Sequence, residues 1–102
     1  MKTLQIYLAD MKELLGGRDF VSARTCLKEL SPIDLADGWE HFTPDERVAI
    51  FRLSTRQRAM QLFEELDPPH QAELLNGLQR KDAQELLSDL DPSETSRMLR
   101  EL

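Results

Sequence analysis

The sequence predicts an all-α fold, a right-handed superhelix or solenoid of about eight short helices. Three observations carry this prediction: apolar residues recur with the 3.6-residue period of an amphipathic helix, a leucine or phenylalanine returns about every twelve residues, and a helix-capping residue opens most repeats. No stretch alternates apolar and polar residues for long enough to form a strand. With 102 residues the chain is expected to be a single domain, 1–102, with a helical lead-in at 1–30 and repeat units at 31–102.

The lead-in is expected to contain two helices. The first spans residues 4–15, is apolar on more than one side and ends at Gly16, which is followed by a second glycine. The second occupies residues 20–30 and is capped by Asp19. It carries the only cysteine of the chain, Cys26, which is predicted to be a buried structural thiol because no histidine or second cysteine stands near it.

The rest of the chain divides into six units of about twelve residues. The residues that delimit them are Leu30, Phe42, Leu53, Leu66, Leu78, Leu90 and Leu102, of which Leu53 comes one residue early. The units open with Ser31, Thr43, Ser54, Asp67, Gln79 and Asp91, and proline follows four of these. An acidic or amide side chain three residues later, such as Asp34, Glu46 or Gln57, places capping boxes in most units. Helices of about ten residues cannot persist alone in water, so neighbouring units must pack against each other.

Composition and charge narrow the function classes. The formal net charge of −6 and pI near 4.8 argue against nucleic-acid binding, which needs a basic surface to displace counterions from phosphate, and an anionic membrane would repel the chain too. No run approaches the ~20 apolar residues that cross a bilayer, and the charged amino-terminal segment does not resemble a signal peptide. The expected location is the cytoplasm, with any membrane part of the system outside this sequence.

Two histidines are candidates for metal binding or catalysis. Asp37 and His41 stand four residues apart on the helix expected at 32–42, a spacing that can share a metal. Two ligands do not make a site, and Trp39 places this helix near the core, so a solvated Asp–His pair is favoured. His70 has no nucleophile or carboxylate partner at a recognisable spacing, and the chain is expected not to be an enzyme.

Two charge clusters and one tryptophan have structural explanations. The clusters are the acidic run Glu64, Glu65 and Asp67 and the basic spot Arg52, Arg56 and Arg58. The acids are expected to form a solvated face, and the arginines to pair with neighbouring acids, since no glycine-rich loop is present to bind phosphate. Trp39 follows Gly38 inside the expected helix, where glycine costs about 1 kcal/mol relative to alanine. A close helix approach under the ring is the expected compensation, and an anchor for a partner is the alternative.

Three segments carry a resemblance to a known family. The segments LSPIDLAD at 30–37, LFEELD at 62–67 and LLSDLDP at 86–92 resemble the amino-terminal cytosolic domain of MgtE-type magnesium transporters. The resemblance lies in the repeat rhythm and in these signatures, and it runs from about residue 14 to residue 102. It implies a superhelical fold for nearly the whole chain.

The resemblance also implies a regulatory function. In this family the superhelical domain precedes a pair of CBS modules and a transmembrane pore, and Mg²⁺ between carboxylates of the superhelix and the CBS modules holds the assembly closed. Mg²⁺ prefers carboxylate and water oxygens, and it can bridge two negative surfaces that otherwise repel each other. The implied partners are the CBS modules and the membrane domain of the same or an associated chain.

The Mg²⁺ ligands that the resemblance implies are Asp91 and Glu94. By themselves these residues form a helix cap and its capping-box partner, and both roles can coexist because a capping carboxylate keeps free lone pairs. Acidic residues of the family pattern are replaced here by Gln61, Ser93 and Arg97, and a cation at position 97 opposes a bound metal. The sensor is therefore expected to be weakened or relocated.

The last expected helix ends on an apolar stripe formed by Met98, Leu99 and Leu102. Since a solenoid needs a polar terminal unit, these residues are predicted to be an interaction surface, covered by a continuation of the chain or by a second copy in a homodimer. The alternative function is a stand-alone helical-repeat adaptor or FliG-like scaffold without ion sensing, because flagellar-motor switch proteins of the FliG type use similar short helical repeats.

Overall fold

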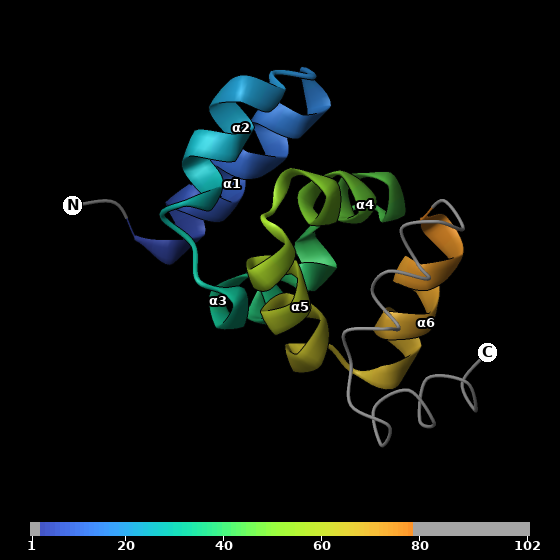
Figure 1. The fold of residues 1–102 in the computed structure, drawn as a ribbon. Coiled ribbons are helices and arrows are strands. Elements are labelled where there is room, and N and C mark those ends of the chain that lie inside the picture. The colour runs from blue at the N-terminus through green and yellow to red at the C-terminus, as the bar shows by residue number, and fades with distance from the viewer. Residues whose placement is uncertain (1–2, 79–102) are drawn as a thin grey trace.

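The computed structural model describes residues 3–78, and this part is helical throughout (Figure 1). Its elements are α1 (Leu4–Gly16), α2 (Phe20–Leu27), α3 (Pro32–Asp37), the 3₁₀ turn η1 (Trp39–His41), α4 (Pro44–Leu53), α5 (Arg56–Glu65) and α6 (Pro68–Gly77). The absence of strands within residues 3–78 confirms the all-α class. The helices expected at 79–102 lie outside the described residues, so the complete right-handed superhelix of eight helices stays a prediction.

Two of the predicted capping boxes form and set the starts of α3 and α4. The Ser31 hydroxyl accepts a hydrogen bond from the N–H of Asp34 at 3.1 Å, and the Thr43 hydroxyl accepts one from the N–H of Glu46 at 3.2 Å. The two carboxylates accept in return from the N–H groups of the capping residues. A proline occupies the start of both helices, where its missing N–H leaves no hydrogen bond unmade.

The predicted cap of α5 is wrong by one residue. Thr55, not Ser54, accepts from the N–H of Arg58 at 3.3 Å, so Gln57 does not occupy the capping-box position. The reason lies in the preceding helix: Ser54 is the residue that ends α4, and its hydroxyl donates to the carbonyl of Ile50 at 2.8 Å. Leu53 closes its unit one residue earlier than the twelve-residue spacing, so Ser54 and Thr55 follow it in succession. Ser54 ends α4, and Thr55 is left to cap α5.

Asp67 starts α6 without a side-chain capping bond. The first two helical positions are Pro68 and Pro69, so the second of them has no N–H for a capping side chain to accept from. The predicted start of this helix is confirmed, while its capping interaction is absent.

The first repeat unit, residues 31–42, is not one continuous helix of about ten residues. α3 ends at Asp37, and η1 follows after Gly38, so Asp37 and His41 do not share a helix as expected. A Cβ on Gly38 would lie 2.6 Å from Leu8 Cδ1, which shows that α1 contacts the backbone directly at this break. The close helix approach expected at Gly38 is confirmed, since Leu8 of α1 lies against this glycine. Gly38, however, stands between α3 and η1 and not inside one helix.

The lead-in forms the two expected helices with adjusted ends. Asp19 caps α2 by accepting from the N–H of Ser22 at 3.2 Å, as predicted, but α2 ends at Leu27, before the expected residue 30. Between the helices, Arg18 holds the left-handed conformation with φ 59°, a conformation more common for glycine. The N–H of Asp19 then donates to the carbonyl of Leu14 at 2.9 Å, which satisfies one of the last carbonyls of α1.

The core is built by helices that lie two units apart in the sequence. α3 packs on α5 and α4 packs on α6, while α1 contacts α2 and both of these contact α4. The apolar lattice residues that are buried in this core are Leu30, Phe42, Leu66 and Leu78. Leu53, the residue that arrives early, is half-buried against them. Packing between every second unit therefore supplies the burial that each short helix lacks alone, whereas the sequence led us to expect packing between adjacent units.

Arg58 connects the repeat units to the lead-in. Its Nη2 donates to the carbonyl oxygen of Leu27 at 3.0 Å and to that of Leu30. The prediction that this arginine pairs with neighbouring acids is therefore wrong: within residues 3–78 its hydrogen-bond acceptors are backbone carbonyls at the end of α2. The Leu27 carbonyl also accepts from the N–H of Leu30 at 3.1 Å, so Arg58 adds a charged donor where the negative end of the helix dipole favours a cation.

Candidate functional site

The residues to which the sequence assigns Mg²⁺ binding and partner contact lie outside the described residues. They are Asp91 and Glu94 for the metal, Met98, Leu99 and Leu102 for the interaction surface, and Ser93 and Arg97 among the replaced acids. Among residues 3–78, no group of three or more His, Cys, Asp or Glu side chains is arranged to hold a metal. Asp37 and His41 are both exposed, in agreement with the solvated interpretation.

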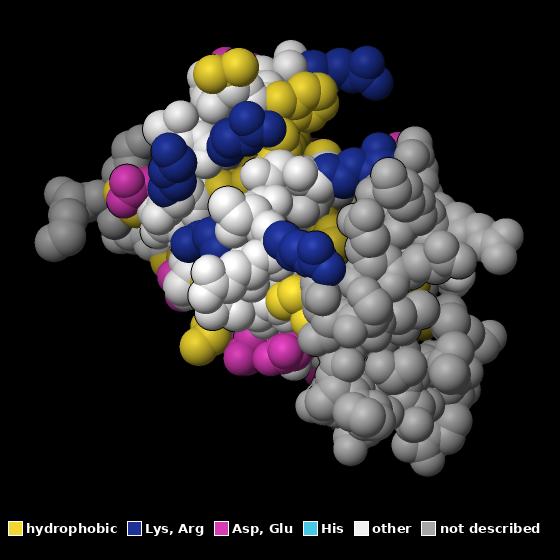
Figure 2. Space-filling view, in the orientation of Figure 1, with side chains coloured by type: hydrophobic (Ala, Val, Ile, Leu, Met, Phe, Trp, Pro, Cys, Tyr) yellow, Lys and Arg dark blue, Asp and Glu magenta, His cyan; other side chains and the backbone are white. Residues whose placement is uncertain are grey.

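The acidic face of α5, defined as Glu64 and Glu65 together with Asp67 at the start of α6, is on the surface. All three side chains are exposed, as the sequence predicts for a solvated face, and acidic side chains gather below α5 in Figure 2. Gln61 is exposed too, and it stands three and four residues before the two glutamates, so it lies on the same side of the helix. Gln61, which replaces an acid of the family pattern, thus belongs to the acidic face of α5.

A polar network joins η1, α4 and α6. The Arg47 guanidinium donates through Nη1 to Glu73 at 2.6 Å and through Nε to the carbonyl of Trp39 at 3.1 Å, and it lies 6.0 Å from the centre of the Trp39 ring. Next to it, His70 Nε2 lies 3.6 Å from an oxygen of Glu40. His70 therefore has a carboxylate neighbour that the sequence analysis missed, because the two residues are far apart in the chain.

Trp39 is a core residue and not an anchor for a partner. Its side chain is only 1% exposed, which overturns the alternative considered from the sequence. Its Nε1 and the Oε1 of Gln71 are buried without a hydrogen-bond partner among the described residues. Gln71 is fully buried and donates through Nε2 to the carbonyl of Phe63 at 2.7 Å, so it fixes α6 on the end of α5.

A second ion pair holds α1 on α4. Lys12 Nζ lies 2.8 Å from Oε1 of Glu46, the same oxygen that accepts the Thr43 N–H of the capping box. Partial burial by itself would raise the pKa of Glu46, but the hydrogen bonds from Lys12 and Thr43 and the positive charge of Lys12 outweigh it. The pKa of Glu46 therefore lies below its ordinary value, and the carboxylate stays ionised in the folded protein.

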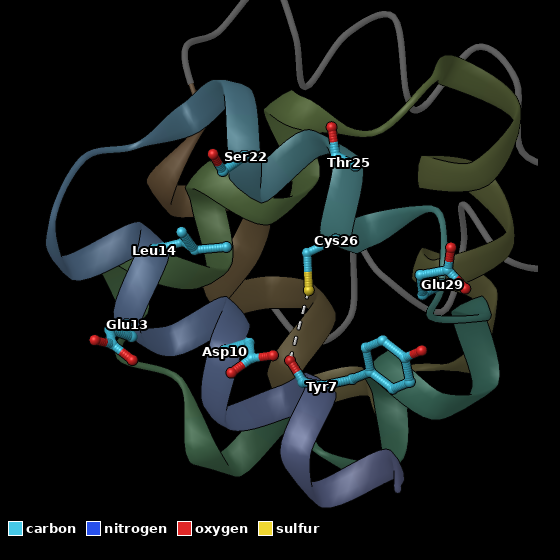
Figure 3. Close-up of a pocket in the computed structure, with 8 residues that line it drawn as sticks. All are labelled: Tyr7, Asp10, Glu13, Leu14, Ser22, Thr25, Cys26 and Glu29. Carbon is cyan, nitrogen blue, oxygen red and sulfur yellow. Dashed lines mark hydrogen bonds between the residues drawn. The ribbon is translucent and has the colours of Figure 1, made fainter. Parts of the chain in front are cut away.

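An acidic cleft opens between α1 and α2 (Figure 3). Its lining residues are Tyr7, Asp10, Glu13, Leu14, Ser22, Thr25, Cys26 and Glu29, and it encloses about 620 Å³. Cys26 lies in its wall with Sγ 3.7 Å from the carbonyl oxygen of Tyr7. The thiol is half-buried and packs against the core, so its structural role agrees with the prediction, although its burial is incomplete.

The comparisons with known proteins assign the family. Residues 30–102 match the family described as the MgtE intracellular N domain, which is more than half of the chain and somewhat less than the resemblance from residue 14 suggested. Neither the curated proteins nor the solved structures include a significant match. No helix within residues 3–78 is long and apolar enough to cross a membrane. The chain belongs to the family of MgtE intracellular N domains.

Proposed function

We propose that this chain is a cytosolic regulatory domain of a magnesium transporter. It gates Mg²⁺ transport through protein contacts and Mg²⁺-bridged contacts with CBS modules and with the membrane domain of the same or an associated chain. The observation that carries the proposal is the family match over residues 30–102. This family is one of transporter regulatory domains rather than of enzymes, in line with the absence of a recognisable catalytic arrangement in the sequence.

The charge of the chain supports a role for Mg²⁺ as a bridge. The net charge is −6, and the acidic face of α5 points its carboxylates into solvent, where a second acidic domain would be repelled. A divalent cation between two such surfaces removes the repulsion and offers oxygen ligands on both sides. When the Mg²⁺ concentration falls, the surfaces separate, and this separation is the event that opens the pore.

Asp91 and Glu94 are the proposed Mg²⁺ ligands on this chain. The acidic face of α5 adds charge that attracts the cation without enough side chains to form a closed site. Arg97 and the loss of acids at Gln61 and Ser93 weaken the site, so we propose that Mg²⁺ is held only at the interface with the CBS modules, where the partner supplies further oxygens.

The test is a melting experiment on this chain joined to the CBS region of its transporter. If Mg²⁺ binds at the interface with a Kd of about 1 mM, about 10 mM Mg²⁺ stabilises the pair by roughly 1.4 kcal/mol, or a rise of about 3–5 °C in melting temperature. Small-angle scattering measures the accompanying compaction. NaCl of equal ionic strength is the control for screening.

Paired variants locate the effect. The double variant Asp91→Asn with Glu94→Gln is expected to lose most of the Mg²⁺-dependent rise, whereas Glu13→Gln with Glu29→Gln, which removes the same charge from the cleft between α1 and α2, is expected to keep it. An unchanged size and melting temperature with and without Mg²⁺ would remove the sensing role. That result would favour the alternative, a stand-alone adaptor or FliG-like scaffold.

A further inference from the structure

An apolar groove runs between α2 and α4. It is lined by Phe20, Asp45, Val48, Ala49, Arg52 and Leu53 and encloses about 310 Å³. Phe20 is 43% exposed at its edge, and the adjacent Val21 is 82% exposed. Phe20 therefore lines the groove while part of its ring stays in contact with water, and Val21 adds exposed apolar surface on the same helix.

Basic side chains lie on the helices that form this groove and at the start of α5. Arg24 and Lys28 are exposed and follow Phe20 by four and eight residues, so they continue along the same side of α2. Arg52 lines the groove from α4. The exposed Arg56 lies at the start of α5. The hydrogen bonds from Arg58 to the end of α2 hold this part of α5 close to α2.

We call these four cations, Arg24, Lys28, Arg52 and Arg56, the basic rim. Figure 2 shows Lys and Arg side chains gathered over α2, α4 and α5 with apolar side chains between them, and acidic ones mainly at the margins. This arrangement runs against the charge of the chain, which is −6. Between residues 59 and 78 every Asp, Glu, Lys or Arg is an acid, so all cations of the described part lie between residues 3 and 58.

We propose that the groove between α2 and α4 is a docking site for an acidic amphipathic helix of a partner protein. Apolar side chains of that helix, spaced three and four residues apart, enter the groove beside Phe20 and Leu53, and its flanking carboxylates pair with the basic rim. The occupant follows from charge complementarity, because the four cations of the basic rim outnumber Asp45, the one acid among the described residues that line the groove. The proposal is independent of Mg²⁺, which these cations repel, and so goes beyond the ion-bridged contacts above.

A helix fits the surface better than a lipid bilayer does. The concave apolar groove matches a row of inserted side chains, whereas a flat membrane would leave the groove empty. The net charge of −6 also opposes approach to an anionic membrane. Membrane binding is therefore treated as an outcome that would contradict the proposal.

The test uses a fluorescent synthetic peptide of about 18 residues, long enough for about five helical turns, with one leucine stripe flanked by glutamates. The matched control peptide has the same sequence with lysines in place of the glutamates. Fluorescence anisotropy with the 102-residue chain is expected to give saturable binding of the glutamate peptide and at least about tenfold weaker binding of the lysine peptide. Amide shifts in ¹⁵N NMR spectra are expected to cluster on α2 and α4.

Variants of the chain test the apolar lining of the groove and the basic rim separately. Phe20→Ser, which removes an aromatic anchor, is expected to weaken binding about tenfold. Arg24→Gln with Lys28→Gln is expected to weaken it about fivefold, since each rim pair contributes about 0.5 kcal/mol. Val21→Ser replaces Phe20→Ser if circular dichroism shows that the latter does not fold.

Matched controls separate the groove from general effects. Ile33→Ser removes an exposed apolar side chain from α3, and Gln5→Glu with Asn76→Glu lowers the net charge by the same two units as the rim variant. Both are expected to bind the glutamate peptide normally. Equal binding of the two peptides, no saturable binding, or an equal loss in the controls would overturn the proposal. Binding to vesicles of phosphatidylcholine and phosphatidylglycerol without peptide binding would overturn it in favour of a membrane.

Discussion

Arg58 is predicted to contribute more to stability than any exposed cation of the described residues. Its Nη2 donates to the Leu27 and Leu30 carbonyls at the end of α2. A hydrogen bond to a charged donor contributes about 1.5–3 kcal/mol, and these two bonds share one nitrogen of a half-buried side chain. We therefore expect Arg58→Met, which keeps the apolar stem, to lower the free energy of unfolding by about 2 kcal/mol.

This loss corresponds to a decrease of about 10 °C in melting temperature for a chain of this size. Arg58→Lys is expected to recover about half of the loss, because the ammonium group keeps the positive charge and can donate from one nitrogen but is shorter in reach and more strongly hydrated than a guanidinium. Urea unfolding followed by the fluorescence of the buried Trp39 measures the free energy. Unchanged m-values would show that the variants alter stability and not the compactness of the unfolded state.

The matched control is Arg24→Met, which removes an exposed cation from α2 itself. It is expected to change the free energy of unfolding by less than about 0.5 kcal/mol. If Arg58→Met and Arg24→Met cost the same, the carbonyls at the end of α2 do not depend on Arg58, and the reasoning from its hydrogen bonds is refuted.

Thr55→Ala should lower the free energy of unfolding by about 1 kcal/mol, and Ser54→Ala by less than half of that, in the same urea experiment. A larger effect of Ser54→Ala than of Thr55→Ala would indicate that Ser54 caps α5, as the sequence suggested. Because the pKa of Glu46 is lowered, its ionised form stabilises the fold above the ordinary pKa, and this contribution disappears as the pH falls through the folded value. Stability of the unmodified chain should therefore decrease more steeply between about pH 5 and pH 3 than that of Glu46→Gln, and parallel curves would contradict the pKa shift. Burial of Trp39 predicts blue-shifted emission and weak quenching by acrylamide, and emission resembling free tryptophan would show that the ring is exposed.

Local interactions are the part of the fold that could be predicted from the sequence. The capping boxes of Ser31 with Asp34 and of Thr43 with Glu46 join residues three apart, so one short pattern contains both partners. The same logic failed at α5, where two hydroxyl residues stand side by side and either could cap. The end of the preceding helix decided between them, and this competition is not visible in a pattern of single helices.

Contacts between distant residues could not be predicted. Glu40 and His70 meet only because η1 and α6 lie together, and the acceptors of Arg58 are backbone carbonyls, which every sequence provides at every position. The break at Gly38 depends on Leu8, which lies thirty residues earlier. The candidate Mg²⁺ ligands are a separate case: the resemblance to the family supplied them, and they lie outside residues 3–78.

The lead-in at 1–30 is an integral part of the fold, although the family match begins at residue 30. Leu8 fills the space that a side chain at position 38 would need, Lys12 pairs with Glu46, and Arg58 closes the end of α2. These contacts join the lead-in to three different later elements. Because the short repeat helices cannot persist alone, α1 and α2 supply the first surface on which the repeat helices pack. The structural unit therefore includes α1 and α2, which lie ahead of the residues by which the family is matched.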